Sequence, residues 1–209
     1  MVDIVDLVIH FDKYLGLVIN YFGPASYFVL FLIIFCETGL VFLPFLPGDS
    51  LLFVAGTFAG TGALDIWILF FTLTLAAILG DSVNYALGKF IGEKVFLKNG
   101  LLKKEHLDKA KRFYEKYGGK TIVLARFVPI VRTVAPFVAG MGEMKYAKFI
   151  GFNILGGVLW VGLFLFAGYF LGSIPIIKEN LTLLVFIVII VSFLPVIVEL
   201  VKHKLEKKK

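Results

Sequence analysis

Long apolar segments recur along this sequence, and the solvent they require decides the class of fold. Of the 209 residues, 59% are hydrophobic and the mean hydropathy is +0.93, whereas soluble domains have about 45–50% apolar residues. One soluble core of this size cannot bury so much apolar surface, so most of the chain must face lipid. Because about 20 residues cross a bilayer as a helix, residues 1–209 are predicted to form a single all-α integral membrane domain with roughly four to six inserted segments.

The basic residues are concentrated in two stretches. Between Lys89 and Lys120 there are ten Lys and Arg residues and four Asp and Glu residues. The tail from Lys202 to Lys209 has five basic residues and one acidic residue. Together these stretches hold 15 of the 21 basic residues. Membrane proteins concentrate Lys and Arg on their cytoplasmic side, so we expect both stretches there, the C-terminus included. The apolar background disfavours nucleic acid as a partner.

Two apolar segments are interrupted by proline. In residues 24–60 the break falls at Pro44–Asp49, and the apolar sequence that resumes at residues 51–58 is too short to cross a bilayer. Residues 121–140 contain two arginines and two prolines within a length that barely spans. Non-helical backbone at membrane depth must be enclosed by protein. We therefore predict two re-entrant, broken-helix hairpins, at residues 24–60 and 121–140.

The remaining segments are more regular. Uninterrupted apolar sequence predicts membrane spans at residues 65–88, 146–172 and 181–201. Residues 101–118 place apolar side chains three and four apart among Lys, Glu and Arg, which predicts an amphipathic helix on the basic face of the membrane. Residues 3–22 mix apolar and charged positions and are typical of an interfacial helix whose placement stays open.

A weak internal repeat accompanies these segments. Val-Ala-Gly occurs at residues 54–56 and 138–140, and Gly-x-Phe-x-Gly occurs at residues 88–92 and 168–172. The corresponding offsets are 84 and 80 residues. With the basic stretches placed inside, the two halves have opposite orientations, which is the inverted-repeat arrangement of many transporters. We predict a first repeat over about residues 24–92 and a second over about residues 121–172.

Charged residues inside the apolar segments are the candidates for function. They are Glu37, Asp49, Asp81, Arg126 and Arg132. An ionised side chain at the bilayer centre costs about 2.5–3.5 kcal/mol even on lenient scales, so such residues are rarely incidental. A break at Pro129 would let both arginines face one site, where two guanidiniums suit a phosphate or a carboxylate. The acids could take up a proton as they lose water.

A structural explanation of the same residues stays open. The acids and arginines could neutralise each other as buried ion pairs, since buried charges need partners whatever their function. Asp81 could also lie near the end of a span and bond to Ser82 or Asn84.

The side chains that most enzymes require are missing from the apolar segments. The three histidines, His10, His106 and His203, all lie outside them, and no nucleophile has a neighbouring base. Cys36 is the single cysteine, so there is neither a disulfide framework nor a Cys/His cluster for a metal. We therefore expect no enzyme activity, no metal and no cofactor.

Four motifs in this order carry a resemblance to a known family. They are Phe35-Cys36-Glu37-Thr38-Gly39, Pro44-x-x-Pro47-Gly48-Asp49, Gly80-Asp81-x-x-x-Tyr85-x-x-Gly88 and Arg126-Phe127-x-Pro129-x-x-Arg132-Thr133. Over roughly residues 25–172 the chain resembles the bacterial branch of the DedA family, also called the SNARE-associated Golgi protein or VTT family.

The resemblance implies a multi-pass protein of the bacterial cytoplasmic (inner) membrane with two re-entrant loops and inverted repeats. Bacterial members resemble proton-dependent transporters, and some are associated with returning undecaprenyl phosphate across that membrane. The family's functional acids and arginines correspond to Glu37, Asp49, Arg126 and Arg132. We expect the arginines to bind the substrate phosphate and the two acids to couple protons. The expected supporting residues are Asp81, Pro47, Gly48 and Pro129.

The predicted function is thus a flippase-like transporter of a lipid phosphate, with lipid and protons as its partners. Three alternatives stay open: a broad phospholipid scramblase or phosphatidylethanolamine translocase, a proton-coupled exchanger of small ions or drugs, and a membrane organiser without transport activity. The lipid, the coupling stoichiometry and the oligomeric state stay open as well.

Overall fold

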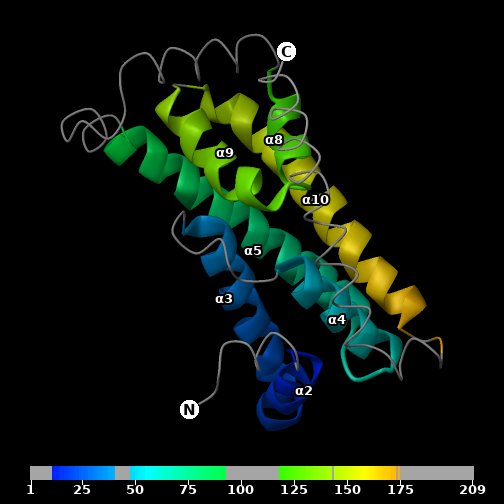
Figure 1. The fold of residues 1–209 in the computed structure, drawn as a ribbon. Coiled ribbons are helices and arrows are strands. Elements are labelled where there is room, and N and C mark those ends of the chain that lie inside the picture. Colours follow the sequence, from blue (N-terminus) through cyan, green and yellow to red (C-terminus); the bar gives the residue numbers. More distant parts are fainter. Residues whose placement is uncertain (1–10, 41–47, 93–117, 143, 173, 175–209) are drawn as a thin grey trace, which may run out of the picture. The chain divides into compact units, whose positions relative to one another are not determined.

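The structure is a computed structural model that describes residues 11–40, 48–92, 118–142, 144–172 and 174. Within these ranges the chain is helical apart from turns and short connections, as the all-α prediction requires (Figure 1). The α-helices are α2 (Phe11–Phe22), α3 (Ser26–Gly39), α4 (Gly48–Gly60), α5 (Ile66–Leu87), α8 (Lys120–Ala125), α9 (Pro129–Met141) and α10 (Tyr146–Leu171). A 3-10 turn, η1 (Gly23–Ala25), precedes α3, and a π-helical turn, η2 (Gly88–Gly92), follows α5.

Three helical stretches in the described part of the chain are long and apolar enough to cross a membrane: Lys13–Gly39, Ile66–Phe90 and Tyr146–Leu171. The last two coincide with the predicted spans at residues 65–88 and 146–172. The first begins earlier than the predicted segment at residues 24–60, because α2, η1 and α3 follow one another without a gap. The predicted helix at residues 101–118 and the predicted span at residues 181–201 lie outside the described residues.

Both predicted proline breaks separate two helices. Helix α3 ends at Gly39 and α4 begins at Gly48. Helix α8 ends at Ala125, and α9 begins at Pro129 after Val128 in an extended conformation with φ −122° and ψ 105°. A proline disfavours helical backbone in the residue before it, so Pro129 starts a new helix and cannot continue the old one. Whether these helix pairs are re-entrant hairpins stays a prediction.

The chain forms two compact units. The α4 unit takes residues 1–26, 47–69 and 162–209, and the α9 unit takes residues 27–46 and 70–161. Helices α5 and α10 belong mainly to the α9 unit, and α10 contributes its C-terminal part to the α4 unit. In the α9 unit, α9 lies beside the C-terminal part of α5, and α8 lies beside α10 (Figure 1). A buried cluster joins these four helices: Tyr85, Ile122, Ala125, Ala135, Ala139, Met144 and Phe149.

Glycine allows α4 and α10 to touch within the α4 unit. A Cβ added at Gly56 of α4 would lie 2.1 Å from the carbonyl oxygen of Leu165. One added at Gly168 of α10 would lie 1.9 Å from the carbonyl oxygen of Phe53. Real side chains never approach backbone so closely, so only glycine permits this separation of the two helices.

The α9 unit contains a matching contact between α9 and the end of α5. A Cβ at Gly140 would lie 2.0 Å from the Tyr85 carbonyl oxygen, and one at Gly88 would lie 2.0 Å from the Phe137 carbonyl oxygen. Gly140 and Phe137 lie 84 positions after Gly56 and Phe53. Gly88 and Tyr85 lie 80 positions before Gly168 and Leu165. The glycines of the two repeated sequence patterns thus make equivalent contacts inside each unit.

We predict that Gly88→Ala destabilises the protein by about 1–3 kcal/mol, the usual cost of overpacking, because the added methyl group meets backbone that cannot rotate away. Gly151→Ala is the matched control, since a Cβ at Gly151 in α10 has nothing within 4 Å. Thermal unfolding in detergent measures both. Equal melting temperatures for the two variants would show that the glycine contact does not limit the packing.

Candidate functional site

Four of the five intramembrane charged residues come together in the α9 unit. Glu37 lies in the last turn of α3, Asp81 in α5, Arg126 directly after α8, and Arg132 in the first turn of α9. All four are buried, with 1% exposure for Glu37 and 9% for Arg132. The predicted convergence of the two arginines at the Pro129 break therefore has a structural basis in this unit.

Arg126 is held by several partners. Its Nη2 donates to Asp81 Oδ2 at 2.5 Å and to Asn153 Oδ1 of α10 at 2.5 Å, with a longer contact to the Ala77 carbonyl at 3.4 Å. Asn153 is itself anchored, because its Nδ2 donates to the Ile78 carbonyl at 3.0 Å. Asp81 therefore lies against Arg126. Buried charges that are paired and also hydrogen-bonded are the ones a low-dielectric interior tolerates.

A glycine of α10 makes room for the Arg126 side chain. A Cβ at Gly156 would lie 3.0 Å from Arg126 Cδ and 3.1 Å from its Nε, which is tighter than most real contacts. Glycine at this position therefore lets the arginine pack closely against α10. The Nε of Arg126 is buried and has no hydrogen-bond partner among the described residues.

Arg132 forms the second ion pair. Its Nη2 donates to Glu37 Oε1, and this contact links α9 to the end of α3 across 95 residues of sequence. The guanidinium carbon of Arg132 lies 5.0 Å from the centre of the Trp160 ring.

Trp160 of α10 lies close to both arginines. Its side chain is fully buried, and the guanidinium carbon of Arg126 is 5.9 Å from the same ring centre. The face of an indole attracts cations, and this attraction strengthens where water is excluded. One aromatic ring therefore helps to hold two positive groups that would otherwise repel each other in a medium without water.

Among the described residues of the α9 unit, two arginines are paired with two carboxylates, and these four charges sum to zero. Guanidinium groups bind phosphate and carboxylate with the same planar geometry. Among the described residues no group of three or more His, Cys, Asp or Glu side chains is arranged to hold a metal ion.

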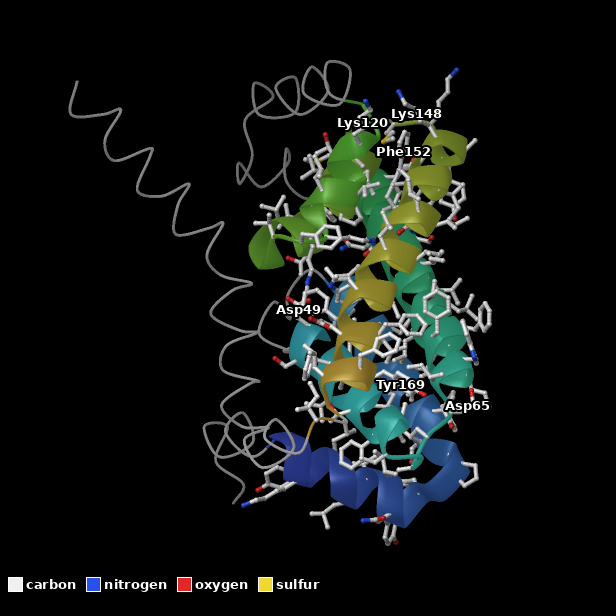
Figure 2. All side chains as sticks on the ribbon, turned by 90° about the vertical axis from the view of Figure 1, so that its right-hand side faces the viewer. Asp49, Asp65, Lys120, Lys148, Phe152 and Tyr169 are labelled. Atoms are coloured by element: carbon white, nitrogen blue, oxygen red, sulfur yellow. The ribbon has the colours of Figure 1, made fainter. Side chains whose placement is uncertain are left out.

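The other predicted site residues have different positions. Asp49 is buried in the first turn of α4 and so belongs to the α4 unit, as does Gly48, where that helix begins. Asp49 is marked in Figure 2 near the start of α4. Pro129 is the first residue of α9. Pro47 lies outside the described residues.

Two lysines lie at one end of the α9 unit. Figure 2 shows Lys120, at the start of α8, and Lys148, in the first turn of α10, at the same end, next to Phe152. A Cβ at Gly119 would collide with the Phe152 ring at 1.8 Å, so glycine brings the start of α8 onto α10 here. Lys120 ends the basic stretch that the sequence predicts to be cytoplasmic.

Sequence reasoning missed Asn153 and Trp160 as parts of the cluster. A lone amide within an apolar span was the available signal for Asn153, because polar side chains in membrane helices usually bond to a neighbouring helix. Trp160 carried no such signal, since tryptophans in apolar helices commonly serve for packing or at interfaces.

These features define a helical membrane protein with a buried, charge-balanced arginine–carboxylate cluster. The VTT domain family matches residues 46–170, which contain Asp49, Asp81 and both arginines. Together with the relatives described next, this match shows that the chain belongs to the DedA family of membrane proteins.

The relatives cover most of the chain. Protein DedA of Escherichia coli K12 is 51% identical over 205 residues, which cover 96% of this chain and 94% of the relative. The uncharacterized membrane protein ML0287 of Mycobacterium leprae is 41% identical over 86% of this chain and 81% of its own length. The inner membrane protein YqjA of E. coli K12 is 38% identical over 72% of this chain and 69% of its own length. No solved structure matches the chain.

We predict that Asp81→Leu alone destabilises the protein by about 3–5 kcal/mol, because it leaves Arg126 as an unpaired buried charge. The double variant Asp81→Leu, Arg126→Leu removes both charges and should recover most of that loss. Thermal unfolding of the two singles and the double gives the coupling between the residues. Additive losses would contradict the pairing.

Proposed function

We propose that this protein translocates a lipid phosphate, of the undecaprenyl phosphate type, across the bacterial cytoplasmic membrane and couples the movement to protons. The observation that carries the proposal is the pair of buried arginines, Arg126 and Arg132, beside one indole ring in a lipid-embedded protein. A lipid phosphate has an anionic head that must cross and a long tail that remains in lipid. Only the head requires a polar site.

The two arginines have different tasks in this mechanism. Arg126 has Asp81, Asn153 and the Ala77 carbonyl as partners, so it is the fixed half of the phosphate clamp. Arg132 bonds to Glu37, and its side chain is less deeply buried than that of Arg126, with 9% against 3% exposure, so we assign the exchangeable position to this pair. The phosphate takes the place of the Glu37 carboxylate at Arg132.

Protonation of Glu37 couples phosphate binding to proton uptake. A buried carboxylate displaced from its arginine is costly as an anion and is stabilised by taking up a proton. The incoming phosphate and the proton therefore bind together, and release of the phosphate restores the ion pair. Asp49, buried at the start of α4, is proposed as the second proton-coupling group.

In this mechanism the site opens first to one side of the membrane and then to the other. Such alternation requires the proposed inverted repeats with two re-entrant hairpins. The equivalent glycine contacts support that arrangement, because Gly56 with Gly168 and Gly140 with Gly88 make the same kind of close contact with backbone carbonyls in each unit. Two related halves are the usual basis for opening a midplane site first to one side and then to the other.

The proposed location is the cytoplasmic membrane, with the C-terminus inside. The printed name of the relative YqjA places that protein in the inner membrane. The basic residues at Lys89–Lys120 and at the tail support the proposed orientation, since positive charge accumulates on the cytoplasmic side.

The direct test is reconstitution in liposomes with a labelled polyprenyl phosphate and, in parallel, a labelled phosphatidylethanolamine. We expect the wild-type protein to move the polyprenyl phosphate selectively and faster under an imposed pH gradient. Arg126→Ala and Arg132→Ala should each slow this movement at least about tenfold, because a lost charge-assisted contact is worth about 1.5–3 kcal/mol. Lys148→Ala, which removes an exposed positive charge outside the cluster, should leave the rate unchanged.

The other outcomes separate the alternatives. Equal movement of both lipids would identify a scramblase. Proton flux without any lipid substrate would identify an ion or drug exchanger. A folded protein that moves neither lipids nor protons would favour a membrane organiser. Normal transport by the Arg126→Ala, Arg132→Ala double variant would contradict the clamp.

A further inference from the structure

Asn84 lies on α5 between the two helices that form the exchangeable ion pair. It is fully buried, and its Nδ2 donates to the Thr38 carbonyl of α3 at 3.2 Å and to the Thr133 carbonyl of α9 at 2.7 Å. Both acceptors are carbonyl oxygens, so only the amide NH2 group can face them, and the orientation of the side chain is fixed by chemistry.

The two acceptors are the sequence neighbours of the ion pair. Thr38 follows Glu37, and Thr133 follows Arg132. A single side chain thus ties together the backbone next to the acid and the backbone next to the arginine. Any movement that separates Glu37 from Arg132 by shifting α3 against α9 must also stretch or break a hydrogen bond of Asn84.

Both hydrogen bonds of Asn84 are made near places where a helix lacks some of its own backbone hydrogen bonds. Thr38 is the second-to-last residue of α3, and carbonyls in the last turn of a helix have no partner within it. In α9, Pro136 lacks the backbone N–H that would bond to the Arg132 carbonyl four residues earlier. Asn84 therefore supports α9 beside the turn that proline has loosened.

Close packing brings the amide within reach. A Cβ at Gly80, one turn before Asn84 on α5, would lie 1.9 Å from Thr38 Oγ1 and 2.8 Å from the Phe35 carbonyl. Glycine at this position lets α3 approach α5 closely. Asn84 Oδ1 is buried and has no hydrogen-bond partner among the described residues. An unsatisfied buried acceptor costs stability, so an apolar residue would be the better choice for packing alone.

We propose that Asn84 is a positioning residue that holds α3 and α9 in register and thereby keeps the Glu37–Arg132 pair closed until substrate opens it. The proposal deepens the proposed function, on which it rests for the meaning of that pair. Asn84 itself binds no substrate in this account. It acts through the two backbone carbonyls beside the acid and the arginine.

The test uses infrared difference spectroscopy of the purified protein in lipid, without substrate. In the wild type we expect Glu37 to be ionised, because it contacts the Arg132 guanidinium. In Asn84→Leu we expect α3 and α9 to shift against each other, so that Glu37 loses Arg132 and takes up a proton. A protonated-carboxyl band should then appear in the spectrum. The same band should be missing from the Asn84→Leu, Glu37→Gln double variant, which would assign it to Glu37. Thr74→Val is the matched control, because Thr74 is also buried on α5 and its Oγ1 has no hydrogen-bond partner among the described residues. It should give no band.

A folded Asn84→Leu protein with the wild-type carboxyl spectrum would overturn the proposal. Asn84→Ala repeats the test with a smaller side chain, and loss of folded protein in both variants while Thr74→Val folds would also overturn it, because Asn84 would then serve the fold itself. Transport is measured separately, and Asn84→Leu should move the polyprenyl phosphate more slowly than Thr74→Val does. Failure of the wild type to move that lipid would contradict the proposed function, whereas the infrared result would still decide the role of Asn84.

Discussion

The need to neutralise charge where water is absent governs this structure. Two arginines inside a membrane protein require counter-charges and hydrogen-bond acceptors at fixed positions, and the α9 unit supplies both. Asp81 and Asn153 hold Arg126, Glu37 holds Arg132, and the Trp160 ring lies beside both guanidiniums. Each arginine is thus paired with its own carboxylate inside one buried cluster.

The interruptions of the helices serve this cluster. Helix α8 ends at Ala125, and Pro129 starts the new helix α9. Because of this break, two arginines six residues apart in sequence lie beside the same indole ring. Glycines then set the distances between helices: Gly80 brings α5 to α3, and Gly156 makes room for Arg126. The costly features of the sequence, namely prolines and glycines in apolar helices, are thus the ones that place the charges.

Much of this arrangement could be predicted from the sequence, because breaks and spans depend on local residue types. Proline, glycine and apolar length indicated the two interrupted segments and the helices at residues 66–87 and 146–171. The partners of the charges could not be predicted, since they depend on how helices pack. Asp81 pairs with Arg126, 45 residues away, whereas the sequence also allowed its neighbours Ser82 and Asn84 as partners. Asn84 instead bonds to backbone carbonyls of α3 and α9, and no local pattern in the sequence indicates this connection.

In the proposed mechanism, phosphate and carboxylate exchange at Arg132 and the displaced Glu37 takes up a proton. Proton exchange during binding of a short-chain polyprenyl phosphate, measured with a pH indicator in weakly buffered detergent solution, tests this step. We expect net proton uptake by the wild-type protein on binding and a clearly smaller uptake by Glu37→Gln. Binding without proton uptake, or with equal uptake by the two proteins, would contradict it.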